Sequence, residues 1–185
     1  MRVIAGAAKG HRLIAPKGYK TRPTADRVKE SLFNIIAGVI EGARVLDVYA
    51  GAGSLAIEAL SRGAGTAVLV DNDRAAIMAI ERNLAATGLA DQAVVMNAPV
   101  SRALAHLSRR DQSFDLILLD PPYKIDRAEL EIVLATAAGC LNKQGQIVVE
   151  HRADLPELKL NDSLELVDER RYGDTRLSFY KEREK

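Results

Sequence analysis

The sequence contains one cysteine, no tryptophan and only three histidines among its 185 residues. A single cysteine, Cys140, excludes an intramolecular disulfide and a metal site built on several thiolates, and we expect it to fill space in the core. The histidines, His11, His106 and His151, are too far apart in the sequence to show metal-ligand spacing. We therefore predict that the protein has no metal site.

Long hydrophobic runs are also missing. No segment approaches the roughly 20 apolar residues that span a bilayer, and the first residues lack the apolar stretch of a secretory signal. The 48% hydrophobic and 28% charged residues are typical of a globular protein in water. We therefore expect a cytoplasmic protein without a membrane role, and a chain of this length fits one main domain.

The net charge is only +1, but the charges are unevenly distributed along the chain. Residues 1–30 carry eight basic and two acidic side chains, hence +6, which leaves −5 for the other 155 residues. We expect residues 1–22 to form a short basic arm or hairpin and residues 23–185 to form the main domain. A basic arm suits an anionic partner such as nucleic acid, although a solvated basic surface explains the charge equally well.

Apolar runs of strand length alternate with segments of helical periodicity between Arg44 and Val149, which predicts an α/β fold with a mostly parallel sheet and helices on both faces. Continuous Val and Leu runs suit strands that are covered on both faces. The expected strands are 44–49, 67–71, 93–96, 114–120 and 146–150, and the expected helices are 54–62, 74–87, 99–109 and 127–138.

The segments on either side of this region are also predicted to be regular. Thr24 can cap a helix that runs to about Ile40. Five residues at helical spacing are expected to face the core: Val28, Leu32, Ile35, Ile36 and Val39. Near the other end, segments 164–171 and 175–180 flank Tyr172-Gly173-Asp174, which predicts a closing antiparallel hairpin.

A glycine-rich turn, Asp47-Val48-Tyr49-Ala50-Gly51-Ala52-Gly53, follows the first predicted strand, and backbone can approach a ligand closely there. The spacing Gly51-x-Gly53-x-x-Ala56, with Asp71 20 residues after Gly51, also fits a dinucleotide site in which an acid binds ribose hydroxyls. A carboxylate at Asp47 would repel a pyrophosphate but attracts the ammonium and sulfonium of S-adenosylmethionine. We therefore favour this methyl donor over a dinucleotide.

Other candidate contacts to the donor lie where predicted strands end, because ligands of open α/β sheets bind at the carboxyl ends of the strands. We expect Asp71 at the ribose, and the Asn97 amide with the Ala98 N–H at the adenine edge, although Asn97 is almost as typical of a turn. The complete predicted donor site is Asp47, Tyr49, Ala50, Gly51, Gly53, Asp71, Asn72, Asn97 and Ala98.

The fourth predicted strand ends in Asp120-Pro121-Pro122-Tyr123. Two adjacent prolines cannot continue a strand ladder, so the chain must form a stiff loop at the ligand-binding edge. An exocyclic base amine is a poor nucleophile because its lone pair is delocalised, and hydrogen bonds to the Asp120 carboxylate and the Pro121 carbonyl would orient it for in-line attack. Tyr123 can stack on the base. We therefore predict that these four residues form the catalytic loop of an amino-methyltransferase.

The two motifs, in this order, resemble those of class I amino-methyltransferases, which combine a turn like Asp47-x-x-x-Gly51-x-Gly53 with an Asp/Asn-Pro-Pro-Tyr/Phe loop. The sequence is more narrowly similar to the RsmD-type bacterial enzymes over nearly its whole length. The segments that carry this similarity are Arg2–Gly6 with Lys9-Gly10, Arg22–Asn34, Glu58–Ala64 and Tyr172–Thr175.

The resemblance implies a Rossmann-like class I methyltransferase fold with seven strands, S-adenosylmethionine as the donor, and the N2 amino group of a guanine in small-subunit (16S) ribosomal RNA as the acceptor. We expect a monomer that acts on this RNA in a partly or fully assembled small subunit. The basic segment then supplies the expected contacts to RNA phosphates, which are Lys9, Arg12, Lys20, Arg22 and Arg27.

Three alternatives remain open at this point. The same chemistry could act on adenine N6 in DNA or on a protein glutamine, although the chain has no large target-recognition domain. A non-catalytic RNA-binding or assembly factor on the same scaffold is disfavoured by the intact Asp47, Gly51, Gly53 and Asp120. A dinucleotide oxidoreductase is disfavoured by Asp47 and leaves the Pro-Pro loop without a role.

Overall fold

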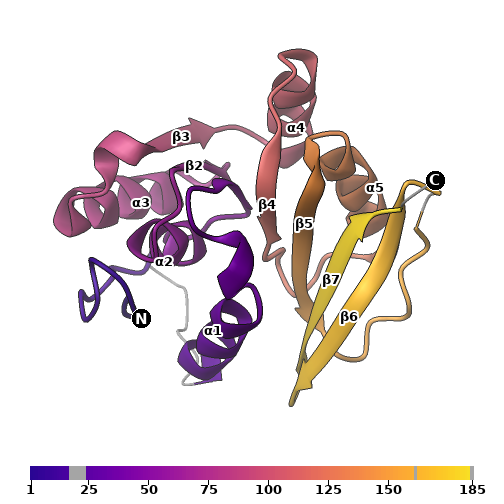
Figure 1. The fold of residues 1–185 in the computed structure, drawn as a ribbon, viewed down its shortest axis with the longest axis horizontal. Helices are drawn as coiled ribbons and strands as arrows, with labels where there is room; N and C mark the ends of the chain where they lie inside the picture. Colours follow the sequence, from indigo (N-terminus) through magenta and orange to yellow (C-terminus); the bar gives the residue numbers. More distant parts are fainter. Residues whose placement is uncertain (17–23, 161, 184–185) are drawn as a thin grey trace.

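The computed structural model describes residues 1–16, 24–160 and 162–183, which form one mixed sheet of seven strands in the order β3-β2-β1-β4-β5-β7-β6 (Figure 1). Five strands run parallel, and β7 and β6 add an antiparallel hairpin next to β5. The strands are β1 (Arg44–Val48), β2 (Thr66–Asp71), β3 (Ala93–Asn97), β4 (Phe114–Leu119), β5 (Leu141–Arg152), β6 (Leu164–Tyr172) and β7 (Thr175–Glu182). The predicted Rossmann-like class I fold is confirmed.

Helices cover both faces of this sheet. The first face packs against α1 (Thr24–Ile35), α2 (Ser54–Ser61) and α3 (Arg74–Thr87), and the second against α4 (Val100–Arg109) and α5 (Arg127–Ala138). Two short 3-10 turns, Ala37–Val39 and Ala90–Gln92, complete the described helical elements. Each face therefore has its own apolar cluster, and the buried strands between them are apolar on both sides, as their sequences predict.

Most predicted bounds are accurate to one or two residues, but β5 is longer than expected. It begins at Leu141, whereas residues 141–145 look like a polar loop in the sequence. Leu141 pairs with Phe114, and the Asn142 side-chain amide donates a 2.6 Å hydrogen bond to the Asp115 carboxylate. A register shift on β4 between Phe114 and Leu116 accommodates the extra residues. Pairing with β4 thus overrides the local preference for a loop.

The predicted helix 24–40 is wrong at its end, because α1 stops at Ile35 and a 3-10 turn follows. Ile35 is exposed rather than core-facing, and Phe33 is fully buried in its place. The tighter turn includes Gly38, which disfavours continuation of an α-helix. The side chain of Thr24, the predicted cap, lies outside the described residues.

Residues 1–16 form a short hairpin that packs on the domain. Within it, the Val3 N–H donates to the His11 carbonyl at 3.0 Å and the Gly10 N–H donates to the Val3 carbonyl at 2.9 Å. Val3, Ala8 and Leu13 are buried in the apolar cluster of the first sheet face. The described part of the predicted basic arm is therefore a docked element of the fold.

Two side chains of α2 hold this hairpin. The Glu58 carboxylate accepts the Ile4 and Ala5 N–H groups at 2.8 and 3.0 Å. The Ser61 hydroxyl accepts the Ala8 N–H at 2.9 Å and donates to the Ala5 carbonyl at 2.6 Å. Because Glu58 and Ser61 are buried, these bonds satisfy backbone groups of the hairpin without water.

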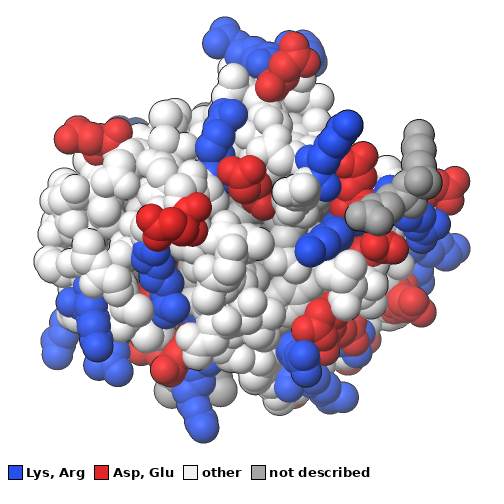
Figure 2. Space-filling view, viewed as in Figure 1, with Lys and Arg blue, Asp and Glu red and all other residues white. Residues whose placement is uncertain are grey.

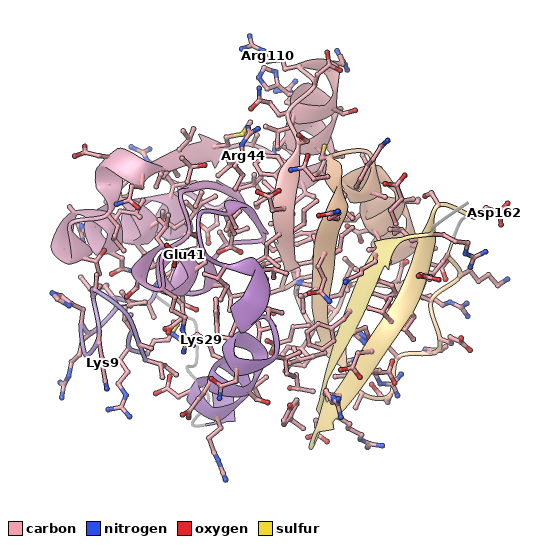
Figure 3. All side chains as sticks on the ribbon, viewed as in Figure 1. Lys9, Lys29, Glu41, Arg44, Arg110 and Asp162 are labelled. Atoms are coloured by element: carbon pink, nitrogen blue, oxygen red, sulfur yellow. The ribbon has the colours of Figure 1, made fainter. Side chains whose placement is uncertain are left out.

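Two cations neutralise the buried Glu58. The Arg62 Nε lies 2.8 Å and the Lys29 Nζ 3.3 Å from its carboxylate oxygens, and Lys29 also donates to the Arg2 carbonyl at 2.7 Å. This network joins α1, α2 and the hairpin, which leaves Lys9 and Arg12 exposed at its surface. Lys and Arg side chains gather over the hairpin at the lower left of Figure 2, and Figure 3 labels Lys9 there.

Gly6 is the point of closest approach between the hairpin and α2. It has a φ of +83°, and an added Cβ would lie 1.7 Å from the Ser61 carbonyl oxygen. Gly10, at the hairpin turn, has a similar φ of +88° but has nothing within 4 Å of an added Cβ. An alanine at Gly10 would therefore introduce backbone strain alone, whereas an alanine at Gly6 would introduce the same strain and a steric clash with α2.

We expect Gly6→Ala to lower the free energy of unfolding by more than about 3 kcal/mol, because the hairpin must move away from α2. Gly10→Ala should cost only about 1–2 kcal/mol, the strain of a left-handed alanine. Urea denaturation of both variants measures the difference. Equal losses would show that the hairpin does not pack on Ser61 as described.

Candidate active site

Three carboxylates lie at the carboxyl edge of the parallel strands. Asp71 is the last residue of β2, Asp120 directly follows β4, and Asp47 is the penultimate residue of β1, which lies between them. Val48 of β1 pairs with both Val70 and Leu119, so the ends of the three strands are aligned. Ligands of open α/β sheets bind at this edge, and the sequence-based prediction placed the site here.

Asp47 is buried, with 1% of its surface exposed. Its Oδ2 accepts the Ala56 N–H at 3.0 Å, which fixes the start of α2, while no described group hydrogen-bonds to the buried Oδ1. Burial raises the pKa of Asp47 to about 7; the Ala56 hydrogen bond opposes this rise, and the charges of Asp120 and Asp71 add to it. A cation bound near Oδ1 would therefore stabilise this carboxylate.

The glycine turn leaves open space next to these carboxylates. An added Cβ at Gly51 would meet no atom within 4 Å, whereas one at Gly53 would lie 2.9 Å from a methyl carbon of Leu69. Both glycines have left-handed φ values, +57° and +74°. Gly51 thus faces the space in which a ligand can lie, and Gly53 allows the turn to pack on the core.

Asp71 supports the turn directly. Its Oδ2 accepts the Gly51 N–H at 2.8 Å and its Oδ1 accepts the Asp73 N–H at 2.9 Å. Carboxylate oxygens have further lone pairs, so a role at the ribose stays compatible with these bonds. Removing the Asp71 side chain would disturb the turn as well as any contact to the donor.

Buried Asn83 of α3 also holds the turn, although the sequence analysis did not single it out. Its side-chain amide donates to the Ala52 carbonyl at 2.9 Å. The same amide group accepts the Ile14 N–H at 2.8 Å and donates to the Ile14 carbonyl at 2.9 Å. One side chain thus connects the glycine turn with the amino-terminal hairpin.

The remaining residues of the predicted donor site differ in burial and in their hydrogen-bond partners. Asn97 and Asn72 are exposed at the rim, with Asn97 paired to Asp71. The Ala98 N–H donates to the Asp71 carbonyl at 3.0 Å, so the predicted contact of this N–H with adenine would require that bond to break. Tyr49 has a φ of +63° and its ring packs in the apolar cluster of the second sheet face.

Ala50 and the Tyr49 hydroxyl also belong to the predicted donor site. The Ala50 N–H donates to the Val70 carbonyl at 3.0 Å, which ties the turn to β2. Burial, together with the charge of Glu129, raises the pKa of Tyr49 to about 12, so its hydroxyl is neutral at physiological pH. The Tyr49 side chain packs on the second face of the sheet, whereas Asp47 contacts α2 on the first face.

The loop Asp120–Tyr123 leaves the sheet directly after β4. The Asp120 N–H donates to the Val48 carbonyl at 3.3 Å, Pro121 is buried, and the Ile125 N–H donates back to the Pro122 carbonyl at 2.8 Å. Tyr123 is 39% exposed, and its hydroxyl lies 3.2 Å from the Thr175 hydroxyl. Two prolines and these hydrogen bonds hold the loop directly after β4, and its rigidity stays a prediction from the sequence.

Desolvation by neighbouring protein atoms raises the pKa of Asp120 to about 6. The rise at Asp47 is larger, and there the charges of Asp120 and Asp71 add to the effect of burial. The two carboxylates also repel each other, as the effect of Asp120 on Asp47 shows. Asp120 is therefore largely ionised at pH 7 and can accept hydrogen bonds.

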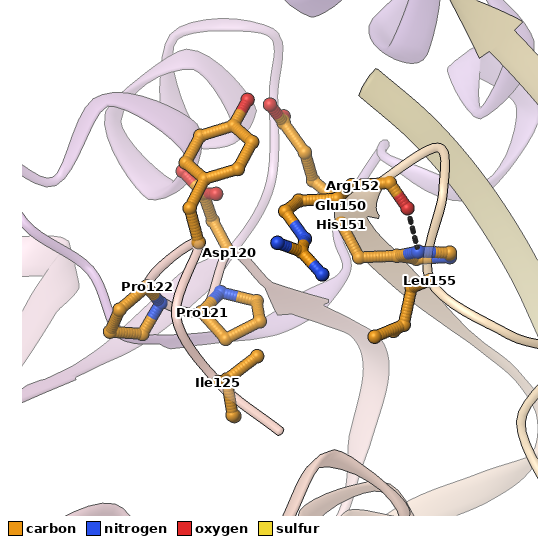
Figure 4. Close-up of a pocket in the computed structure, with 9 residues that line it drawn as sticks. Asp120, Pro121, Pro122, Ile125, Glu150, His151, Arg152 and Leu155 are labelled. Carbon is orange, nitrogen blue, oxygen red and sulfur yellow. Dashed lines mark hydrogen bonds between the residues drawn. The ribbon is translucent and has the colours of Figure 1, made fainter. Parts of the chain in front are cut away.

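A pocket lies between this loop and the carboxyl end of β5 (Figure 4). Its space, including the solvent at its mouth, is about 290 Å³. The lining residues are Asp120, Pro121, Pro122, Tyr123, Ile125, Glu150, His151, Arg152 and Leu155. The four predicted catalytic residues are thus brought together at one pocket of limited size.

Three pocket residues from β5 were missed in the sequence analysis. Glu150, His151 and Arg152 directly follow the apolar run Ile147-Val148-Val149, as Asp120 follows the apolar run of β4. This shared position was the available signal. His151 is 7% exposed, its Nδ1 donates to the Arg152 carbonyl at 2.9 Å, and its Nε2 lies 2.9 Å from the Ser178 hydroxyl.

The described residues contain neither a cluster of metal-ligating side chains nor a helix that could span a membrane. Among residues 1–16, 24–160 and 162–183, no group of three or more His, Cys, Asp and Glu side chains is arranged to hold a metal ion. In the same ranges, no helix is both long and apolar enough to cross a membrane. Cys140 is buried among apolar residues of the second sheet face, as expected for a core residue.

Comparison with known proteins identifies the family. The family described as "Conserved hypothetical protein 95" matches residues 1–181. Ribosomal RNA small subunit methyltransferase D of Escherichia coli K12 is 39% identical over 166 residues, which are 89% of this chain and 82% of that protein. The chain belongs to the RsmD-type methyltransferases.

Two further relatives extend this family likeness to the whole chain. A Bacillus subtilis protein that is provisionally named an rRNA methyltransferase is 40% identical over 183 residues, 99% of this chain and 100% of that protein. The solved structure of a hypothetical protein from Thermus thermophilus is 30% identical, with a TM-score of 0.83 and coverage of 97% and 98% of the two chains. The similarity to these relatives therefore extends over the amino-terminal hairpin and the β6–β7 hairpin as well as the central sheet.

Proposed function

We propose that this methyltransferase transfers a methyl group from S-adenosylmethionine to the N2 amino group of a guanine in small-subunit ribosomal RNA. The observation that carries the proposal is the arrangement at the carboxyl edge, where the Asp-Pro-Pro-Tyr loop follows β4 and the buried Asp47 and the glycine turn lie at the end of the adjacent strand β1. The family likeness to ribosomal RNA small subunit methyltransferase D supports the choice of RNA as the acceptor.

The donor is S-adenosylmethionine, and the residues at the turn fit it. Asp47 Oδ1 is a buried acceptor without a described partner, Gly51 faces open space, and the carboxylates of Asp47, Asp71 and Asp120 favour a cation. When bound, the donor supplies an electrophilic methyl group on a sulfonium, which becomes a neutral thioether after transfer. The carboxylate cluster thus stabilises the charged donor more than the neutral product.

Asp120 and Pro121 would orient the acceptor amine. Its two hydrogens can be accepted by the Asp120 carboxylate and the Pro121 carbonyl, which fix the nitrogen and localise its lone pair as a new N–C bond forms. Tyr123 offers a ring face on which the base can stack. The prolines keep these groups in place, so positioning accounts for most of the rate increase.

The proton leaves after the methyl group has arrived. Methylation makes the amine nitrogen positively charged and therefore acidic, so a strong general base is unnecessary. Asp120, with a pKa raised to about 6, can accept this proton or pass it to water at the open mouth of the pocket. The product is then the neutral methylamino base.

The amino-terminal hairpin is the proposed contact to RNA phosphates. Lys9 and Arg12 are exposed on it, and Arg27 is exposed on α1, while Lys20 and Arg22 lie outside the described residues. The hairpin and α1 lie in the lower half of Figure 1, and β4 and β5 run downward toward that half. RNA held on this surface can therefore reach the pocket.

The proposal is tested by incubating ribosomal RNA and small subunits from cells lacking this enzyme with protein and labelled donor, followed by mass spectrometry of the nucleosides. N2-methylguanosine is the expected product. Label in N6-methyladenine of DNA or in glutamine of ribosomal protein, offered in parallel reactions, would replace the proposed acceptor. Absence of label from all substrates, with donor bound, would contradict an enzymatic role.

Replacing Lys9 and Arg12 together by alanine should weaken RNA binding and reduce the salt dependence of the affinity by about one unit of slope per lost phosphate contact. Donor affinity should not change. The matched control is Arg109→Ala with Arg110→Ala, because this exposed pair lies at the end of α4 on the opposite edge of the sheet (Figure 3). If the hairpin variant and the control have the same slope, RNA binds elsewhere.

A further inference from the structure

We propose that Glu150 and Arg152 recognise the Watson–Crick edge of the target guanine, with the Glu150 carboxylate accepting the N1–H and the Arg152 guanidinium donating to O6. This inference rests on the proposed guanine-N2 activity and adds the residues that select the base. These two residues lie on β5, whereas the groups proposed to hold the reacting amine lie in the loop after β4.

The pairing of β4 with β5 places Glu150 next to Asp120. Leu119 pairs with Val149 in parallel register, so Asp120 and Glu150 are the next residues on adjacent strands. Val148 packs in the cluster of the first sheet face, and alternation puts Glu150 and Arg152 on that same face. Figure 4 shows both side chains, with Asp120, around one pocket.

The register of β4 and β5 gives the polar groups an order that can match guanine, because Asp120 lies next to Glu150 and Arg152 is two residues further along β5. Along its Watson–Crick edge, guanine presents the N2 amine, the N1–H and the O6 acceptor. Asp120 and Pro121 provide acceptors for the amine, Glu150 provides the next acceptor, and Arg152 provides a donor. Adenine would place the N1 lone pair against the Glu150 carboxylate and the 6-amino group against the Arg152 guanidinium, so both contacts would be repulsive.

The backbone around Arg152 is fixed while its side chain can change partners. The Arg152 carbonyl accepts the His151 Nδ1–H, and Arg152 pairs with Thr175, whose hydroxyl lies 3.2 Å from that of Tyr123. The Arg152 Nε lies 3.2 Å from Asp154, with side chains 46% and 76% exposed. An exposed ion pair of this kind is weak, so a base in the pocket can compete for the guanidinium.

The test uses the small-subunit ribosomal RNA fragment whose guanine is methylated by the wild-type protein, and a second fragment with 2-aminopurine at that position. 2-Aminopurine keeps the 2-amino group but has no O6 and carries a lone pair at N1. Wild-type protein should prefer guanine by about a hundredfold or more in kcat/KM, because a site built for two hydrogen bonds rejects a base that lacks both.

Glu150→Gln should reduce this preference at least tenfold, because the glutamine amide can donate to the N1 lone pair of 2-aminopurine. Arg152→Ala should lower kcat/KM on guanine RNA about tenfold or more and leave 2-aminopurine RNA unaffected, since that base has no O6. Asp154→Ala, which removes the present partner of Arg152, is the matched control and should preserve the wild-type preference. Calorimetric donor binding checks that each variant is folded.

An unchanged guanine preference in Glu150→Gln would overturn the role of Glu150. Equal losses on both RNAs in Arg152→Ala would indicate a phosphate contact and overturn base recognition by Arg152. Either result, with N2-methylguanine still formed by wild type, leaves the proposed function intact. A wild-type protein that forms no N2-methylguanine would instead contradict the proposed function itself.

Discussion

Asp120→Ala is expected to lower the rate of methyl transfer about a hundredfold or more while donor binding is retained. The carboxylate is proposed to hold the reacting amine, and removal of one preorganised electrostatic partner in an active site has effects of this size. Single-turnover methylation at saturating RNA and donor measures the rate. Unchanged turnover would exclude the proposed role of Asp120.

Asp120→Asn provides the matched comparison, because an amide oxygen accepts the same hydrogen bond but does not titrate. Wild-type activity should fall below pH 6, since protonation removes an acceptor and the pKa of Asp120 is about 6. A bound cationic donor stabilises the carboxylate and shifts this midpoint further down. Asp120→Asn should retain more activity than Asp120→Ala and show no such acidic limb.

Asp47→Asn is expected to abolish tight donor binding and yet stabilise the donor-free protein at pH 8. The pKa of Asp47 is about 7 in the folded protein and near 3.8 without burial, so between these values the folded state holds a proton that the unfolded state has lost. The stabilisation from this proton is complete below about pH 4 and disappears as the pH rises through 7. At pH 8 the folded protein therefore carries a buried charge that asparagine lacks.

The expected gain in unfolding free energy at pH 8 is on the order of 2 kcal/mol, because the relief of charge burial is partly offset by an unpaired amide hydrogen. At pH 5 the gain should be much smaller, since folded Asp47 then keeps its proton and only part of the stabilisation has been lost. Urea unfolding at both pH values, with and without donor, measures this. A variant that is destabilised at pH 8, or stabilised by donor as much as wild type, would contradict the role given to Asp47.

The sheet could be predicted from the sequence because its signals are local. Runs such as Val45 to Val48 and Leu116 to Leu119 are apolar on both faces, and glycines at positions 63 and 88 stop helices where the structure does. The glycine turn and the Asp120 loop are short contiguous motifs at strand ends. Their shared edge follows from parallel topology alone.

Contacts between distant segments could not be predicted in the same way. Glu58 looks like an ordinary residue of an amphipathic helix, yet it accepts backbone N–H groups 53 and 54 positions earlier in the chain. The exchange of Phe33 for Ile35 in the core depends on where α1 ends, which local spacing does not determine. Glu150 and Arg152 follow an apolar strand, which is a local signal, but their place beside Asp120 depends on the register between β4 and β5.

The position of Asn83 between the glycine turn and the amino-terminal hairpin has a consequence for how donor binding and RNA binding affect each other. The Asn83 side-chain amide bonds to Ala52 in the glycine turn and to Ile14 in the amino-terminal hairpin. If RNA binding displaces Ile14, we expect the change to act on the turn through this amide, and ordering of the turn by the donor to act on Ile14 in return. Linkage requires the two effects to be reciprocal: the factor by which RNA changes donor affinity equals the factor by which donor changes RNA affinity.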